Sequence, residues 1–142
     1  MKAKYALRAL CTLARRDREP LAARVLAEDA HIPEKFLETI LVELRNAGFV
    51  DSRRGLAGGH RLARPADAIV VGDVIRALDG PLAPLRCASV TAYRPCDDCA
   101  DPAACALRHL MGDVRDAIAS VLDTRTLQQL AAAERAAVPV GS

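Results

Sequence analysis

Apolar residues recur every three or four positions along most of this chain, which is the spacing of one face of an α-helix. Pro33 suits the first turn of a helix and Gly48 suits the position just after one, so both mark helix boundaries. The stripes and boundaries together predict helices over residues 3–14, 21–30, 34–47, 71–78, 107–122 and 127–136. We therefore expect a mainly α-helical fold.

The stretch after Gly48 breaks the helical period. Residues 49–53 alternate between apolar and polar positions, residues 55–59 contain three glycines, and residues 60–63 can return as a second strand. This pattern predicts a β-hairpin with a glycine-rich tip. Because two helices joined by a short turn precede it, the order of elements predicts a winged helix-turn-helix DNA-binding domain. The alternative is a hairpin that only closes a sheet.

Charge is divided unevenly along the chain. The whole chain carries +2, yet residues 1–64 hold 13 Lys and Arg against 8 Asp and Glu, whereas the remainder holds 7 against 10. A basic first half favours contact with a polyanion such as double-stranded DNA, although a solvated basic surface has the same composition. Three arginines on or beside the predicted hairpin could reach phosphates or a minor groove, namely Arg53, Arg54 and Arg61.

The chain has no apolar run of the roughly 18 residues that a membrane-spanning helix needs. Its first residues carry charges at Lys2, Lys4 and Arg8, where a secretion signal would be apolar. We therefore expect a cytoplasmic protein with no membrane partner.

Four of the five cysteines fall within nineteen positions of a proline-punctuated stretch, and His109 follows them. Clustered thiols in a reducing compartment favour a metal or redox centre over a disulfide framework. Their spacing leaves three interpretations open: an iron–sulfur cluster, a four-sulfur zinc site and a metal-free thiol/disulfide switch. Cys11 lies apart, on the apolar face of the first predicted helix, and is expected to be a buried, inert thiol. The four clustered residues are Cys87, Cys96, Cys99 and Cys105.

Four short motifs in the first half of the chain together match those of a known family. They are KYALR at residues 4–8, IPEKFL at 32–37, LRNAG at 44–48 and SRRG at 52–55, followed by the glycines at 58 and 59. The chain thereby resembles the Rrf2 family of bacterial winged helix-turn-helix transcriptional regulators, whose members include IscR and NsrR. The resemblance covers about residues 1–133 and extends to a cysteine loop before a long helix.

The resemblance implies a homodimer in which the long helix pairs two subunits. We expect this regulator to be a repressor rather than an activator. Each wing and recognition helix would then meet one half-site of a pseudo-palindromic DNA operator. On the wing, Arg54 matches the family's arginine. The helical phase of Phe36 suits burial in the core equally well. The recognition helix would offer to the major groove Lys35, Phe36, Glu38 and Thr39.

The resemblance also implies ligands for an iron–sulfur cluster. Family members with a cluster use three cysteines of this loop, and the matching positions are Cys87, Cys99 and Cys105. Cys96 is an additional thiol that could be a fourth ligand or replace Cys99. His109 lies one residue beyond the position of the histidine in IscR, so we expect it to be exposed or packed rather than ligated.

The predicted function is a DNA-binding regulator whose operator affinity depends on a two-iron or four-iron cluster, or on the redox state of the cysteines. Zinc, or a thiol switch without metal, would serve the same regulator. A function of another class, an iron–sulfur carrier or small redox protein, would use the same cysteines. The chain lacks the glycine loop of nucleotide-binding enzymes and any evident catalytic triad, so we do not expect an enzyme.

The same resemblance divides the chain into four segments. Residues 1–64 form the DNA-binding domain, and residues 65–81 are a linker with a short helix. Residues 82–104 are a cysteine-bearing sensor loop. Residues 105–137 hold the dimerisation helix and a terminal short helix.

Overall fold

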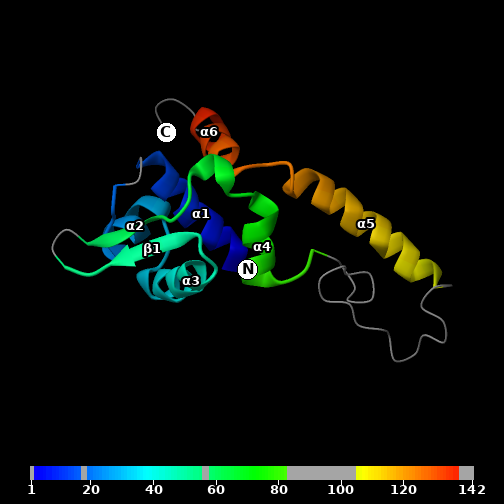
Figure 1. Cartoon of the computed structure of the whole chain (residues 1–142), viewed down its shortest axis with the longest axis horizontal. Helices are drawn as coiled ribbons and strands as arrows, with labels where there is room; N and C mark the ends of the chain where they lie inside the picture. The colour runs from blue at the N-terminus through cyan, green and yellow to red at the C-terminus, as the bar shows by residue number, and fades with distance from the viewer. Residues whose placement is uncertain (1, 17–18, 56–57, 83–104, 138–142) are drawn as a thin grey trace.

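The computed structural model describes residues 2–16, 19–55, 58–82 and 105–137. Most of these residues are helical, and one antiparallel hairpin interrupts the helices, as the hydrophobic pattern predicts (Figure 1). The hairpin strands are β1 (Val50–Arg53) and β2 (Gly59–Leu62). The helices are α1 (Lys2–Arg15), α2 (Ala23–Ala30), α3 (Glu34–Asn46), the 3₁₀ helix η1 (Ala66–Ala68), α4 (Val71–Asp79), α5 (Ala106–Leu122) and α6 (Leu127–Ala137).

Helix α1 lies at the centre of the body and is buried along most of its length. It packs against α2, α3, α4 and α6, so side chains from both ends of the chain meet on it. Leu10 and Leu13 of this helix are fully buried, as are Leu26 of α2 and Leu44 of α3. Each such leucine stabilises the fold by roughly 1.5–3 kcal/mol through removal of apolar surface from water. A single core therefore holds the helix-turn-helix and α6 on one scaffold.

The turn between α2 and α3 is short because His31 adopts a left-handed conformation, with φ of 55°. The amide of the next residue, Ile32, donates to the carbonyl of Ala27 over 3.0 Å, and the Ile32 side chain is buried. Pro33 then precedes the first turn of α3, in agreement with its predicted role. These contacts hold the two helices in a helix-turn-helix.

Leu21 was expected to begin the second helix, but it lies in an extended bridge instead. Its backbone pairs with that of His60 in β2, with N···O distances of 2.9 and 2.7 Å, and α2 begins only at Ala23. Gly59 makes this approach possible, since a Cβ there would lie 2.8 Å from the Leu21 carbonyl oxygen. The bridge ties the entrance of the helix-turn-helix to the wing.

The last two helices differ in how they are attached to the core. Val70 and Thr126 form an antiparallel bridge, and the amide of Leu127 donates to the carbonyl of Ile69 over 2.8 Å. Helix α6 follows this bridge, buries Leu127 completely and packs against α1. Helix α5 instead projects away from the body, and none of its residues is buried in this chain (Figure 1).

Candidate nucleic-acid interface and cysteine segment

The recognition helix α3 has one buried and one exposed face. Its core side consists of leucines and isoleucine, among them Leu37 and Ile40. The other side, near the N-terminal end of the helix, exposes Lys35, Glu38 and Thr39 to solvent. The fold thus places these three predicted DNA-contacting residues on one accessible surface.

Phe36 is not a core residue, so the interpretation that its helical phase leads to burial is wrong. Its side chain is 61% exposed. It lies in the first turn of α3, beyond the edge of the core, where the ring of Tyr5 covers one of its faces. The two ring centroids are 6.4 Å apart and the planes are inclined by 8°, which is an offset stack. The guanidinium of Arg8 lies 5.9 Å from the Tyr5 ring centroid. Tyr5 and Arg8 therefore join this surface, although periodicity gave no signal for them.

The wing presents its three arginines unequally. Arg53 and Arg54 are exposed near the tip, whereas Arg61 is half-buried on β2. In the hairpin register Arg61 lies opposite Asp51, and directly opposed residues share a face of the sheet. The two arginines at the tip are more accessible than Arg61 and are therefore the stronger candidates for contact with DNA.

His60 lies between the wing and the recognition helix, a placement that no pattern in the sequence indicates. Its Nδ1 lies 2.7 Å from the Oγ of Ser52 on the neighbouring strand. Burial lowers the pKa of His60, and the positive charge of Arg45 on α3 lowers it further. All three residues line a small cavity of about 100 Å³ between α2, α3 and the hairpin. The neutral imidazole is therefore the favoured form in the folded protein.

Cys105 is the one residue of the cysteine cluster that the structure describes, since Cys87, Cys96 and Cys99 lie outside the described residues. It is the N-cap of α5, and its Sγ accepts a hydrogen bond from the amide of Arg108 over 3.4 Å. Amide donors and the dipole at a helix N-terminus favour a thiolate, the form in which cysteine binds a metal. Within the described ranges no group of three or more His, Cys, Asp or Glu side chains could hold a metal ion.

His109, which follows the cysteines, is exposed on the first turns of α5. It lines a shallow polar cavity of about 180 Å³ together with Arg108 and Asp113. Cys11 is buried, as predicted, and only 2% of it is exposed. Burial and, secondarily, the charge of Glu134 raise the pKa of the Cys11 thiol to about 12. Such a thiol stays protonated and unreactive at neutral pH.

Helix α5 carries a stripe of apolar side chains that contact no core. Leu107, Leu110 and Val121 are each more than half exposed, and Val114 is 36% exposed. They recur at intervals of three, four and seven residues, so they lie on one face of the helix. A contiguous apolar face of this kind on a projecting helix is typical of a protein–protein interface. Across the described parts of the chain, no helix is long and apolar enough to cross a bilayer.

The recognition helix is exposed, a basic hairpin lies beside it, and α5 projects with an apolar stripe. These features together define a winged helix-turn-helix protein of the DNA-binding class. The sequence profile of the Rrf2 family, described as an iron-dependent transcriptional regulator, matches residues 1–133. The chain therefore belongs to the Rrf2 family of transcriptional regulators. Members of this family bind DNA, and the family is one of regulators rather than enzymes.

Similar proteins span nearly the whole chain. An Rrf2-like helix-turn-helix regulator of Rhodobacter capsulatus is 43% identical over 136 residues, which cover 93% of this chain and 91% of that protein. The structure of CymR, the global cysteine regulator of B. subtilis, superposes with a TM-score of 0.73 and 36% identity over 93% of this chain and 94% of that one. IscR of T. potens gives a TM-score of 0.72 and 30% identity over 99% and 91% of the two chains.

Proposed function

We propose that this regulator acts as a homodimer that binds a pseudo-palindromic operator, most simply as a repressor. The observation that carries the proposal is the apolar stripe of α5, which includes Leu110 and Val114 and contacts no core in the single chain. Two copies of this helix, related by a two-fold axis, would bury their stripes against each other. The axis would also place two identical winged helices side by side on one face of a duplex, one per half-site.

On each half-site we propose that α3 enters the major groove. Lys35 and Thr39 are donors for guanine or phosphate oxygens, and Glu38 can accept from the amino group of cytosine. The exposed ring of Phe36 supplies an apolar surface for a thymine methyl group. In the wing, Arg54 would reach the minor groove or its phosphates, with Arg53 and Arg61 as further cationic contacts.

We further propose that the cysteine segment controls this binding through an iron–sulfur cluster held by Cys105 together with Cys87, Cys96 and Cys99. The N-cap position of the Cys105 sulfur, which accepts an amide hydrogen bond, supports a thiolate ligand there. When bound, such a cluster supplies a centre that can be oxidised, reduced or lost. Because Cys105 is the N-cap of α5, a change at its sulfur acts directly on the helix that pairs the subunits.

We also propose four functional segments. Residues 1–64 bind DNA, residues 65–81 form a linker, residues 82–104 form the sensor and residues 105–137 pair the subunits. The proposal also places the protein in the cytoplasm, because a regulator works in the compartment that holds the chromosome.

Anaerobic purification with analysis of iron, sulfide and zinc tests the cofactor. We expect visible absorption and iron with sulfide in the wild type, loss of both in Cys105→Ser, and retention of both in the matched control Cys11→Ala. One zinc per chain without colour would instead establish a structural zinc site. Protein free of metal, whose DNA binding depends on a thiol reductant, would establish the thiol switch.

Selection from a random-sequence duplex library, followed by binding measurements on the selected duplex, tests the DNA contacts. We expect Lys35→Ala and Arg54→Ala each to weaken binding and to lower the slope of log affinity against log salt, by about one where a phosphate contact is lost. Arg125→Ala, an exposed arginine on the connection between α5 and α6, is the matched control. Equal losses in all three variants would remove the proposed roles of Lys35 and Arg54.

A further inference from the structure

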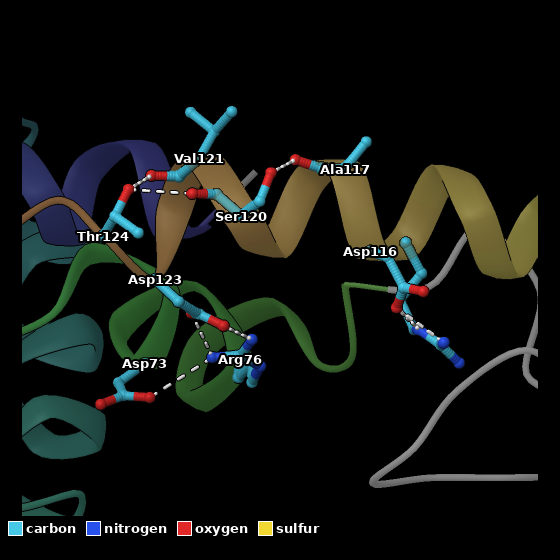
Figure 2. Close-up of polar contacts among 9 residues, drawn as sticks. Asp73, Arg76, Asp116, Ala117, Ser120, Val121, Asp123 and Thr124 are labelled. Atoms are coloured by element: carbon cyan, nitrogen blue, oxygen red, sulfur yellow. Dashed lines mark hydrogen bonds and ion pairs between the residues drawn. The ribbon is translucent and has the colours of Figure 1, made fainter.

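The base of α5 is joined to α4 by a two-pronged ion pair (Figure 2). Arg76 of α4 donates through Nη1 to Oδ1 of Asp123 over 2.8 Å and through Nη2 to Oδ2 over 2.6 Å. Asp123 is the C-cap residue that follows α5, and Arg76 also contacts Asp73 over 3.3 Å. We name the Arg76–Asp123 pair the clamp. Its fork-to-fork geometry fixes direction as well as distance, which a single hydrogen bond does not.

The clamp lies against the first turn of α4, at Gly72, where the missing side chain leaves room for the Asp123 carboxylate. A Cβ on Gly72 would overlap Oδ1 of Asp123 and would also approach the Arg76 guanidinium. The carboxylate of Asp123 therefore lies directly against the backbone of α4. A side chain at position 72 would push Asp123 aside without removing either charge.

Backbone and hydroxyl hydrogen bonds hold the chain beside the clamp. The amide of Val71 donates to the carbonyl of Arg125 over 2.9 Å, and the hydroxyl of Thr124 donates to the carbonyls of Ser120 and Val121 (Figure 2). Beyond this base, α5 buries no residue in this chain. Among the described residues, the clamp is a side-chain contact that ties the end of α5 to the winged-helix body with a defined geometry.

A small tilt of α5 at its base moves the far end of the helix by a large distance. Seventeen residues make a helix of about 26 Å, so a tilt of about 10° moves its far end by about 4–5 Å. One base pair of B-DNA corresponds to about 3.4 Å of rise and about 34° of rotation. A change of this size in the direction of α5 is therefore comparable to one base pair in the separation of two winged helices.

We propose that the Arg76–Asp123 clamp sets the angle between α5 and the winged-helix body and thereby the half-site spacing that the dimer recognises. The inference rests on the proposed function, in which α5 pairs two subunits on a two-half-site operator. Arg76 and Asp123 are positioning residues in this account, since neither lies on the surface formed by α3 and the wing.

The test measures spacing preference directly. Wild-type protein first selects its operator from a random duplex library, and dissociation constants are then measured on that duplex and on duplexes with one base pair inserted or deleted between the half-sites. We expect wild type to bind the altered duplexes about tenfold more weakly. Arg76→Ala, Asp123→Asn and Gly72→Ala should reduce this discrimination to about twofold or move the optimum by one base pair.

Arg15→Ala is the matched control. It removes an arginine–carboxylate pair of similar length, Arg15 to Glu134 at 2.9 Å, which joins α1 to α6 and does not involve α5. This variant should distinguish the half-site spacings as strongly as the wild type does. Gly72→Ala keeps both charged groups, and alanine favours a helix more than glycine does. This variant therefore tests the geometry of the clamp even if Arg76→Ala or Asp123→Asn folds poorly.

Sedimentation and binding to a single half-site duplex accompany each variant. Unchanged discrimination in the folded clamp variants, or an equal loss of affinity on every spacing, would overturn the inference while leaving the proposed function in place. A wild-type protein that is monomeric, or that selects no duplex, would refute the proposed function and the inference with it.

Discussion

Truncation of Leu110 on α5 is expected to weaken the proposed dimer strongly. The side chain is 56% exposed in the single chain, so roughly half of its apolar surface is available for burial by a partner. Full burial of a leucine contributes about 1.5–3 kcal/mol, and half of that contributes about 0.8–1.5 kcal/mol. Because a two-fold interface contains the residue twice, Leu110→Ala should cost about 1.5–3 kcal/mol of dimerisation free energy. This corresponds to a dissociation constant raised about 10- to 150-fold.

Sedimentation equilibrium over a concentration series measures this change. Asp116→Ala is the matched control, because Asp116 is exposed on the opposite face of α5 and pairs with its neighbour Arg115 over 2.7 Å. We expect the control to dissociate like the wild type. The helical content of Leu110→Ala, measured by circular dichroism, should stay at the wild-type level since Leu110 belongs to no core.

A wild-type dissociation constant in Leu110→Ala would refute the reasoning that α5 forms the interface through its apolar stripe. Equal weakening by Asp116→Ala would refute it as well, because both faces of the helix would then contribute alike. Either result would mean that the dimer contact lies on another surface of the protein.

Three further predictions concern stability and are each measured by denaturant unfolding. Leu127→Ala should lower the free energy of unfolding by about 2–5 kcal/mol, because Leu127 is fully buried where α6 joins the core; a loss below about 1 kcal/mol would contradict this packing. Gly59→Ala should destabilise the wing, because Gly59 has φ of 147° and a Cβ would meet the backbone of Leu21, whereas Gly55→Ala, which meets open space, should cost less. The free energy of unfolding should also fall as the pH drops below 6.5, because the pKa of His60 is lower in the folded protein than in the unfolded chain, which therefore binds the proton at higher pH. If His60→Gln has the same pH dependence as the wild type, a group other than His60 causes it.

The helices and the hairpin were predictable because their signals are local. Apolar residues at three- and four-residue intervals found α3 to within a residue of its observed end, and the three glycines of the wing placed the hairpin between the correct strands. Burial of Cys11 followed from the same periodicity. The DNA contacts of α3 and the ligands in the cysteine segment stay predictions, since they depend on partners outside the single chain.

Contacts between distant parts of the chain were not predictable in the same way. Periodicity put Phe36 in phase with the core of α3, yet the ring lies beyond the edge of the core against Tyr5, which is thirty-one positions earlier. Similarly, Leu21 has the spacing of a helix residue but pairs with the backbone of the wing. In both cases a tertiary contact overrides the local preference.

The amino-acid sequence alone therefore established a winged helix-turn-helix with a long amphipathic helix and a cysteine-rich segment, because helical period, turn residues and motif spacing act over a few neighbouring positions. The direction of α5 was decided by the fold. It depends on Arg76 meeting Asp123 across 47 positions, over a glycine whose missing side chain leaves room for the carboxylate. No local sequence pattern predicts this ion pair, because it forms only when folding of the core around α1 has brought α4 and the end of α5 together.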